Sequence, residues 1–318
     1  LTAIIAVVTA FSFIIKGALV TDAEKKKGSF CFSDSTKVWI KHPDHSIQLK
    51  SVKDIQLGDE LAYHCGKITT IIHLSGKNVE LYDILGINVS ESHLVQGEDK
   101  KWKEVKDDER SIKVDIKSDI LYCFNTTSNK IPVCTEKADV LYFRDWEEIS
   151  NDDEIGQLMW NYIVLQLLNK NQKNIDWKKD INRLSELPLV GMDTLIKIKD
   201  GFIPISNIKM GDKVIDKKDR EVEVLGIIYG EVEGLKEIDK KWTIGLYEWI
   251  NNNWRKSNDT IIKGTDKIKG LYLITESGEL IIMGEDGKDR IVRDFTEVGY
   301  VNIHQTYSFV STRLRITD

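Results

Sequence analysis

The sequence contains Thr36-Lys-Val-Trp-Ile-Lys41 and, a little further on, Val52-Lys-Asp-Ile-Gln-Leu-Gly-Asp59. The same order returns as Thr194-Leu-Ile-Lys-Ile-Lys199 and Ile205-Ser-Asn-Ile-Lys-Met-Gly-Asp212. Each copy reads as a strand, a hairpin and a short turn that ends in Gly-Asp. Self-similarity of this kind indicates an internal repeat, so we expect a duplicated β unit.

The similarity continues along both copies in the same order. Its offsets drift only between 158 and 149, as expected when loops differ in length but the scaffold does not. We therefore predict a β domain over residues 31–149 and a second, degenerate copy over residues 188–318. The further matches pair Ile68–Ile72 with Val224–Ile228, Trp102 with Trp254, Leu121-Tyr122 with Leu271-Tyr272, and Arg144-Asp145-Trp146 with Arg293-Asp294-Phe295.

The composition also favours a mostly β protein. The 318 residues include 21 Gly but only 4 Pro, and Val- and Ile-rich stretches occur throughout. With 51 acidic and 45 basic residues the formal net charge is -6, which removes the basic surface of a dedicated nucleic-acid binder. The 4 Cys include no C-x-x-C pair, so a disulfide scaffold and a zinc ribbon are excluded and a cysteine that matters should act as a thiol.

The first twenty residues differ from the rest of the chain. Residues 1–15 carry no charge, and the apolar run resumes after Lys16, which gives about the ~20 residues that span a bilayer. We expect a transmembrane segment over 1–20 and a juxtamembrane linker over 21–30; a buried core helix or a signal-peptide core is the alternative. Lys25–Lys27 would hold the following domains in the cytosol. The chain opens on Leu1, which suggests that a longer protein continues upstream.

A different pattern separates the two β copies. Ser150 and Asp153 have the spacing of a capping box, and apolar residues then recur at helical spacing from Ile155 to Leu168. We expect a helical connector within 150–187 that packs the two β units together. Such an apolar stripe is typical of a core face, and we assign it no chemistry.

The first copy carries chemistry that the second lacks. Cys31 directly precedes the first strand, and Ser90-Glu-Ser-His93 follows 59 residues later between apolar neighbours. A histidine that moves a proton and a hydroxyl that orients the reacting group suit acyl transfer by a thiol. In the second copy Leu189 takes the place of Cys31, and the stretch ahead of Trp254 contains no histidine. We expect the second copy to be inert.

These residues, taken in order, resemble the Hint domain family, the fold shared by inteins and the autoprocessing part of hedgehog proteins. The elements are Cys31-Phe-x-x-x-Thr36, the step that ends in Gly58-Asp59, Ser90-x-x-His93 in place of the family's Thr-x-x-His, and Leu121-Tyr122-x-x-x-Thr126. With an apolar segment ahead, the chain looks most similar to the membrane-anchored Hint proteins of large DNA viruses.

The resemblance implies self-cleavage without a cofactor. Cys31 would attack the carbonyl of Phe30, the peptide bond would become a thioester, and His93 would protonate the departing nitrogen while Ser90 holds the amide or the imidazole. Water, a thiol or an alcohol would then release the upstream chain, and Asp145 would activate that second nucleophile. Neither copy ends on the His-Asn pair of splicing inteins, so full splicing is not expected.

Several alternatives stay open at this stage. The chain could be a catalytically silent, duplicated β domain that serves as a binding platform at a membrane. His42, His45, His64 and Cys65 could bind a transition metal, although solvated loop histidines are the expectation and we predict no metal site. We expect Cys65, Cys123 and Cys134 to be small core or edge residues. The stretch from Lys100 to Arg110 reads as solvated loop surface.

Overall fold

The described part of the chain is built from β-strands. The computed structural model describes residues 31–145 and 189–293, apart from residues 78, 237–242, 245–246, 257–261 and 285. Within these ranges the regular elements are strands and short 3-10 turns, so the prediction of a mostly β protein is confirmed. The predicted segments 1–20, 21–30 and 150–187 lie outside the described residues. No helix in the described ranges has the length and apolarity to cross a bilayer.

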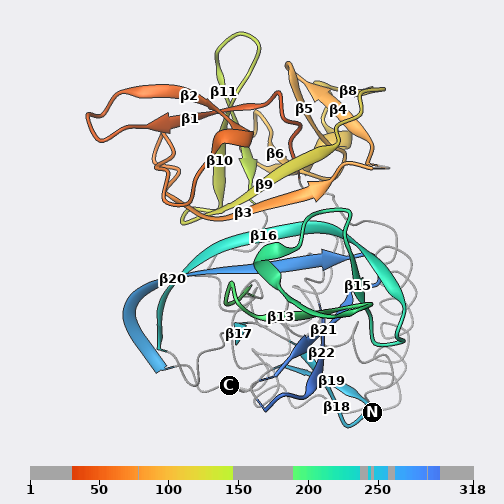
Figure 1. Cartoon of the computed structure of the whole chain (residues 1–318). Coiled ribbons are helices and arrows are strands. Elements are labelled where there is room, and N and C mark those ends of the chain that lie inside the picture. Colours follow the sequence, from red (N-terminus) through yellow and green to blue (C-terminus); the bar gives the residue numbers. More distant parts are fainter. Residues whose placement is uncertain are drawn as a thin grey trace, which may run out of the picture.

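The first half forms an antiparallel six-stranded sheet and a smaller three-stranded one (Figure 1). The larger sheet has the order β2 (Ile47–Ser51), β1 (Lys37–Lys41), β10 (Lys130–Cys134), β11 (Val140–Arg144), β6 (Leu94–Gln96) and β7 (Trp102–Glu104). The smaller has the order β5 (Ile87–Ser90), β4 (Leu81–Ile84) and β8 (Ser111–Val114). The turns η1 (Val52–Asp54) and η2 (Val105–Asp107) follow β2 and β7.

The second half contains a six-stranded sheet with a corresponding strand order. This sheet runs β14 (Gly201–Pro204), β13 (Leu195–Ile198), β21 (Glu279–Met283), β22 (Asp289–Arg293), β18 (Tyr247–Ile250) and β19 (Asn253–Lys256). It begins with a hairpin that is followed by a 3-10 turn, η3 (Ile205–Asn207), just as β1 and β2 are followed by η1. The first strand of each hairpin pairs with a strand from the end of its own half, so each half closes on itself.

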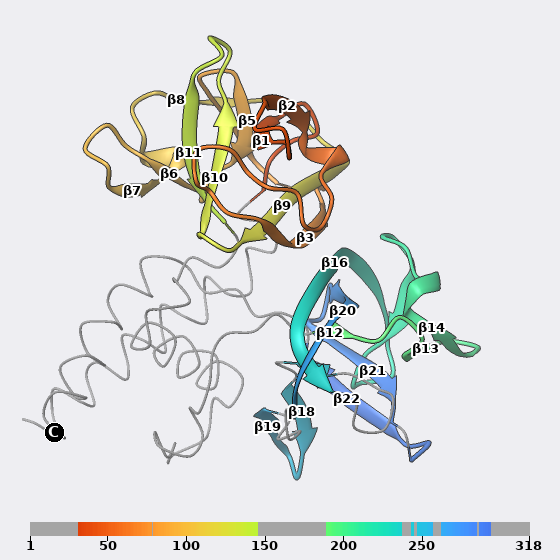
Figure 2. The same cartoon turned by 90° about the vertical axis from the view of Figure 1, so that its left-hand side faces the viewer.

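One sheet runs through both halves. Its order is β17 (Thr243–Ile244), β12 (Leu189–Val190), β20 (Ile262–Thr275), β16 (Glu221–Lys236), β3 (Ile68–Ser75) and β9 (Ile120–Thr126), and β15 (Lys213–Ile215) also pairs with β16. The junction is the antiparallel β3–β16 pair, whose register joins Leu74 to Gly226 and Thr70 to Gly230. The two strands lie side by side in both views (Figure 1, Figure 2).

The repeated Gly-Asp step is the same turn in both halves. Gly58 and Gly211 have φ values of 87° and 88°, a left-handed conformation that a residue without Cβ adopts at no steric cost. Each glycine N–H donates to the first residue of the matching stretch, Ile68 or Val224, at 2.9 Å. The following aspartate closes the turn by accepting a backbone N–H three residues upstream at 2.8 Å. Local turn chemistry therefore explains why this dipeptide recurs.

The register corrects one sequence match by a single residue. Phe32 bridges Tyr122, and the equivalent strand pair in the second half joins Val190 to Leu271. Tyr122 therefore corresponds to Leu271, and Cys123 corresponds to Tyr272, whereas the shared Leu-Tyr dipeptide had aligned Tyr122 with Tyr272. Since strand side chains alternate between faces, a slip of one residue exchanges core and surface positions.

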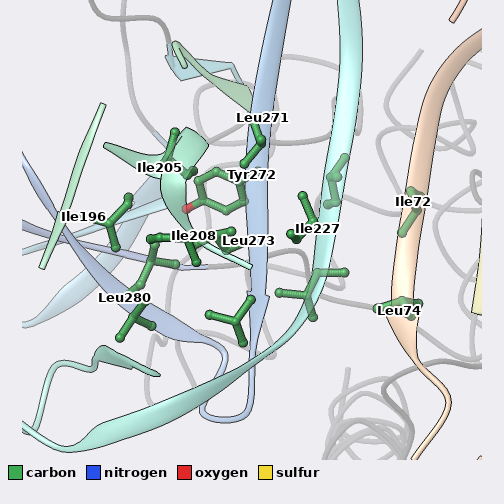
Figure 3. Packing of buried hydrophobic residues seen from close by; sticks show 14 of the residues in the cluster. Ile72, Leu74, Ile196, Ile205, Ile208, Ile227, Leu271, Tyr272, Leu273 and Leu280 are labelled. Carbon is green, nitrogen blue, oxygen red and sulfur yellow. The ribbon is translucent and has the colours of Figure 1, made fainter. Parts of the chain in front are cut away.

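The core extends across the junction between the halves. Ile72 and Leu74 of β3 pack in one buried cluster with Ile227 of β16 and Leu273 of β20, all at most 6% exposed (Figure 3). Burial of each such side chain contributes about 1.5–3 kcal/mol to folding. Cys31 belongs to the same cluster. The candidate site is therefore rooted in the part of the core that both halves share.

Candidate functional site

Ser90 holds both polar backbone groups of Cys31. The Cys31 N–H donates to Ser90 Oγ at 2.9 Å, and the Ser90 N–H donates to the Cys31 carbonyl, also at 2.9 Å. Both residues are completely buried. This clamp fixes the orientation of the amide nitrogen of Cys31, which is the nitrogen of the Phe30–Cys31 peptide bond. Phe30 itself lies outside the described residues.

His93 lies in an apolar cage close to the start of the first copy. Its Nε2 atom is 2.8 Å from the Arg144 carbonyl oxygen, which can only accept, so Nε2 carries the proton. The ring packs on Phe32 with centroids 4.5 Å apart and meets Phe143 edge-on at 5.3 Å. Burial lowers the pKa of His93 to about 4, although the bond to Arg144 acts in the opposite direction. The imidazole is therefore neutral at physiological pH.

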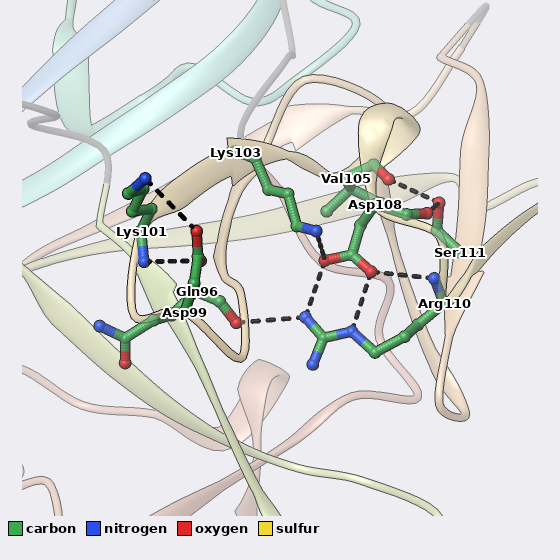
Figure 4. A network of polar contacts seen from close by, with 8 residues as sticks. All are labelled: Gln96, Asp99, Lys101, Lys103, Val105, Asp108, Arg110 and Ser111. Atoms are coloured by element: carbon green, nitrogen blue, oxygen red, sulfur yellow. Dashed lines mark hydrogen bonds and ion pairs between the residues drawn. The ribbon is translucent and has the colours of Figure 1, made fainter.

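A buried ion pair supports the loop that carries His93. The Val105 N–H donates to the His93 carbonyl at 2.9 Å, so the β6–β7 hairpin and η2 hold the histidine backbone. Asp108 follows η2, has a fully buried carboxylate and pairs with Arg110 at 2.7 Å and Lys103 at 3.3 Å (Figure 4). Burial opposes its ionisation, yet hydrogen bonds from Arg110 and Lys103 lower the pKa of Asp108 to about 2.

The prediction that Lys100 to Arg110 form only solvated surface is therefore wrong for Asp108. Its side chain is fully buried, and the Arg110 side chain is 19% exposed. Arg110 also donates to the Gln96 carbonyl at 3.2 Å, which ties β6 to the following turn. Charges read from sequence resemble a solvated loop whether or not they pair, so this burial could not be inferred from residue types alone.

Asp145 is buried at the end of β11, directly after the residue that binds His93. Its carboxylate accepts hydrogen bonds from the Thr126 N–H at 2.8 Å, from Thr126 Oγ1 at 3.2 Å and from Asn129 Nδ2 at 3.4 Å. Burial raises the pKa of Asp145 to about 7, against these hydrogen bonds. A carboxyl group that titrates near neutral pH can both take up and release a proton.

Cys123 lies opposite Cys31, a relation that the sequence analysis missed. Phe32 and Tyr122 exchange two backbone hydrogen bonds of 2.8 and 2.9 Å, which places Cys31 directly across from Cys123 in the antiparallel pair. Burial raises the pKa of the Cys123 thiol well above its usual range, and contact with the Cys31 side chain raises it further. No local motif announces a contact between residues so far apart in sequence.

The corresponding place in the second half contains Leu189 and Tyr272 instead of two cysteines. Leu189 stands where Cys31 does, and it pairs with Ile244, as Cys31 pairs with Ser90. Tyr272, which corresponds to Cys123, donates its hydroxyl to the Arg293 carbonyl at 3.0 Å. That carbonyl corresponds to the Arg144 carbonyl that binds His93. A tyrosine thus takes over the hydrogen bond of the histidine, and none of the thiol chemistry is retained at these positions.

The remaining candidates lie elsewhere. Cys65 is buried in the core of the first half, as expected, and Cys134 is partly exposed at the end of β10. His42 and His45 lie in the β1–β2 hairpin, whereas His64 lies in the turn beside Cys65. Within the described ranges no three His, Cys, Asp or Glu side chains come together in the arrangement of a metal site.

Comparisons with known proteins do not identify a family for this chain. The sequence matches no model of a known protein family and no curated protein.

Proposed function

We propose that this chain is a Hint-type autoprocessing protein that cleaves its own peptide bond between Phe30 and Cys31. The observation that carries the proposal is the hydrogen bond from the Cys31 N–H to Ser90 Oγ, with His93 buried beside it: the His93 N–H donates to the Ser90 carbonyl, and the His93 ring packs on Phe32. A buried cysteine, serine or histidine alone has many structural explanations. A serine clamp on the amide of a cysteine, next to a neutral buried histidine, is the constellation that a thiol-dependent acyl shift requires.

The first step moves an acyl group from nitrogen to sulfur. The Cys31 thiol gives up its proton, its sulfur attacks the carbonyl carbon of Phe30, and the bond between that carbon and the Cys31 nitrogen breaks. The nitrogen takes up a proton and becomes an amine, while residues up to Phe30 remain attached as a thioester. Proton balance is complete because one proton leaves sulfur and one arrives at nitrogen.

His93 has the protonation state for both transfers. With Nε2 committed to the Arg144 carbonyl, Nδ1 of the neutral ring is the basic nitrogen. It can accept the thiol proton and then, as imidazolium, protonate the leaving nitrogen. The low pKa of His93 makes that imidazolium a strong acid, which favours the second transfer.

The thioester would be released by a second nucleophile. Water would give a free carboxylate on Phe30, a thiol would give a new thioester and an alcohol an ester, and each restores the Cys31 thiol. Asp145, with its pKa of about 7, is placed in sequence next to Arg144 and can act as the base for this step.

The proposal extends to the rest of the chain. We infer that residues 1–20 anchor the protein in a membrane, with the β domains over 31–149 and 188–318 in the cytosol and a helical connector over 150–187. The two matching strand orders support a duplication whose second copy has lost its chemistry. Cleavage would free the β domains from the anchor. With a formal net charge of -6, we propose no nucleic-acid partner.

The test uses the 318-residue chain. Intact-mass spectrometry should detect a fragment that begins at Cys31, and dithiothreitol or hydroxylamine should speed its appearance because both intercept a thioester. Cys31→Ala should abolish the fragment, and His93→Ala should slow it by roughly 10²- to 10⁴-fold. Cys65→Ala is the matched control, since Cys65 is also a buried thiol but lies in the other core cluster.

A folded wild-type chain that stays intact with thiol for days would contradict the proposal. The protein would then be better explained as a catalytically silent binding platform. Folding is checked by circular dichroism on each variant, so that loss of structure is not mistaken for loss of chemistry.

A further inference from the structure

The nucleophile of the proposed reaction has a second thiol as its direct cross-strand neighbour. Phe32 and Tyr122 form a pair that exchanges both backbone hydrogen bonds, so the adjacent Cys31 and Cys123 form the pair without such bonds. The backbone groups of Cys31 confirm this geometry, because they turn away from β9 and bind Ser90. Both cysteines are free thiols with no exposed surface.

This position is suited to a disulfide. In antiparallel sheets the Cα atoms of a pair without backbone hydrogen bonds lie about 4.5 Å apart, and disulfides span about 4.4–6.8 Å between Cα atoms. Side chains of such a pair also emerge on the same face of the sheet. Cys31 and Cys123 accordingly belong to one buried cluster. Cys65 and Cys134 have no comparable relation to Cys31, since they lie in or beside the other strands of the first half.

We propose that Cys31 and Cys123 oxidise reversibly to a disulfide that withholds the Cys31 sulfur from acyl transfer. The disulfide itself follows from the strand pairing; its effect on cleavage rests on the proposed function. The second half offers no such pair, because Leu189 and Tyr272 occupy the two positions.

A peroxide can serve as the oxidant. One of the two thiols, as thiolate, attacks an oxygen of hydrogen peroxide and becomes a sulfenic acid, with release of hydroxide. The sulfur of the other thiol then attacks the sulfenic sulfur and the disulfide bond forms. The oxygen of the sulfenic acid leaves as water, and the hydroxide from the first step takes up the remaining proton. In total two thiols and one peroxide give one disulfide and two waters. A small dithiol reverses the reaction by thiol–disulfide exchange.

The proteolytic map of the chain makes the bond directly observable. Trypsin leaves each cysteine on its own peptide, with Cys31 on 28–37, Cys65 on 54–67, Cys123 on 118–130 and Cys134 on 131–137. The full chain, treated with hydrogen peroxide and alkylated without reduction, should yield peptide 28–37 cross-linked to 118–130. After self-cleavage the first partner becomes 31–37, so the bond is detected in either state of the chain. Dithiothreitol should remove the cross-link.

After peroxide treatment the rate of cleavage is measured with and without dithiothreitol, and the ratio of the two rates is compared between variants. In the wild type cleavage should be lost without the reductant and return with it. In Cys123→Ser the ratio should no longer depend on prior oxidation, since the partner sulfur is gone. Cys134→Ala is the matched control and should respond as the wild type does.

The two proposals fail in distinguishable ways. Absence of the 28–37 or 31–37 link to 118–130, or a dominant link to another cysteine peptide, overturns the disulfide. If protein that carries the disulfide cleaves as fast as protein with free thiols, the proposed effect of the disulfide on acyl transfer is wrong. A link that forms while the reduced chain never cleaves supports the cysteine pair but refutes the proposed autoprocessing.

Discussion

Replacement of Asp145 by asparagine should make the protein sensitive to mild acid. In the native state burial lowers the pKa of His93 to about 4 and raises the pKa of Asp145 to about 7. Between these values both groups are neutral in the folded protein. In the unfolded chain their ordinary pKa values of 6.5 and 3.8 apply, so both are charged over most of the same range.

The two groups affect stability in opposite directions. Because the native pKa of His93 is lowered, its contribution is complete above pH 6.5 and is lost as the pH falls towards 4, where only the unfolded state takes up the proton. Because the native pKa of Asp145 is raised, its contribution is complete below pH 3.8 and is lost as the pH rises towards 7. Between about pH 4 and pH 6.5 the native and unfolded states therefore bind the same number of protons at these two groups, and the two effects on stability cancel.

Asp145→Asn removes the contribution of Asp145 to the pH dependence of stability and leaves that of His93. Wild type gains stability from Asp145 as the pH falls, and Asp145→Asn lacks this gain. The gap between 3.8 and about 7, most of which lies between pH 4 and pH 7, implies at about 1.4 kcal/mol for each pH unit that the variant loses about 3 kcal/mol relative to wild type as the pH falls from 7 to 4. His93→Gln, which keeps a donor for the Arg144 carbonyl, lacks the gain that His93 provides as the pH rises. The gap between 6.5 and about 4 implies that this variant loses about 3 kcal/mol relative to wild type as the pH rises from 4 to 7.

Equilibrium urea unfolding at pH 4, 5, 6 and 7, followed by tryptophan fluorescence, measures these differences. Other carboxylates titrate in the same range, so the free energy of unfolding is compared between variant and wild type at each pH. The double variant should follow the wild-type curve with a constant offset. Curves of the single variants that run parallel to wild type would refute the claim that both groups are neutral in the native state.

Three further changes test contacts of the site and of the surrounding fold. Ser90→Ala should slow cleavage and destabilise the fold by about 1–3 kcal/mol because the Cys31 N–H loses its acceptor, whereas Ser90→Thr should restore both in the same mass and urea assays. Gly76→Ala should cost more than about 2 kcal/mol in urea unfolding, since a Cβ would lie 1.9 Å from the Ser118 carbonyl oxygen; Gly287→Ala, with open space around it, should cost only about 1 kcal/mol for its φ of 72°. Asp108→Ala should lower stability by about 2–3 kcal/mol and slow cleavage through the loop of His93, and an unchanged rate would show that the ion pair does not support the site.

The sequence predicted those parts of the molecule that depend on local chemistry. Gly58-Asp59 and Gly211-Asp212 recur because one turn geometry needs a positive φ followed by a side chain that closes the turn. The mostly β class follows from composition and alternation. The pairing of Cys31 with Ser90 was expected only through the resemblance to a family, and the hydrogen bonds between them support that expectation.

Contacts set by strand register could not be predicted in this way. Leu121-Tyr122 and Leu271-Tyr272 are identical dipeptides, yet the strand pairing shows that Tyr122 corresponds to Leu271 and not to Tyr272. The shift is visible only in the pairing with Phe32 and Val190. The same long-range pairing places Cys123 opposite Cys31. Asp108 is buried in an ion pair, although in the sequence it is one of a run of charged residues. The strand register and the cysteine pair depend on residues distant in sequence, whereas the partners of Asp108 are close by and its burial depends on how the loop packs.

The pairing of β3 with β16 has a consequence for synthesis of the chain. Residues 31–145 leave the ribosome well before residue 226, so a nascent first half would present the outer edge of β3 without its partner strand. Unpaired strand edges recruit other strands, and the Ile71-Ile72 stretch makes this edge apolar. Newly made chains are therefore exposed to intermolecular pairing until β16 arrives. A second half that has given up its thiol chemistry still serves the first as the strand that closes this edge.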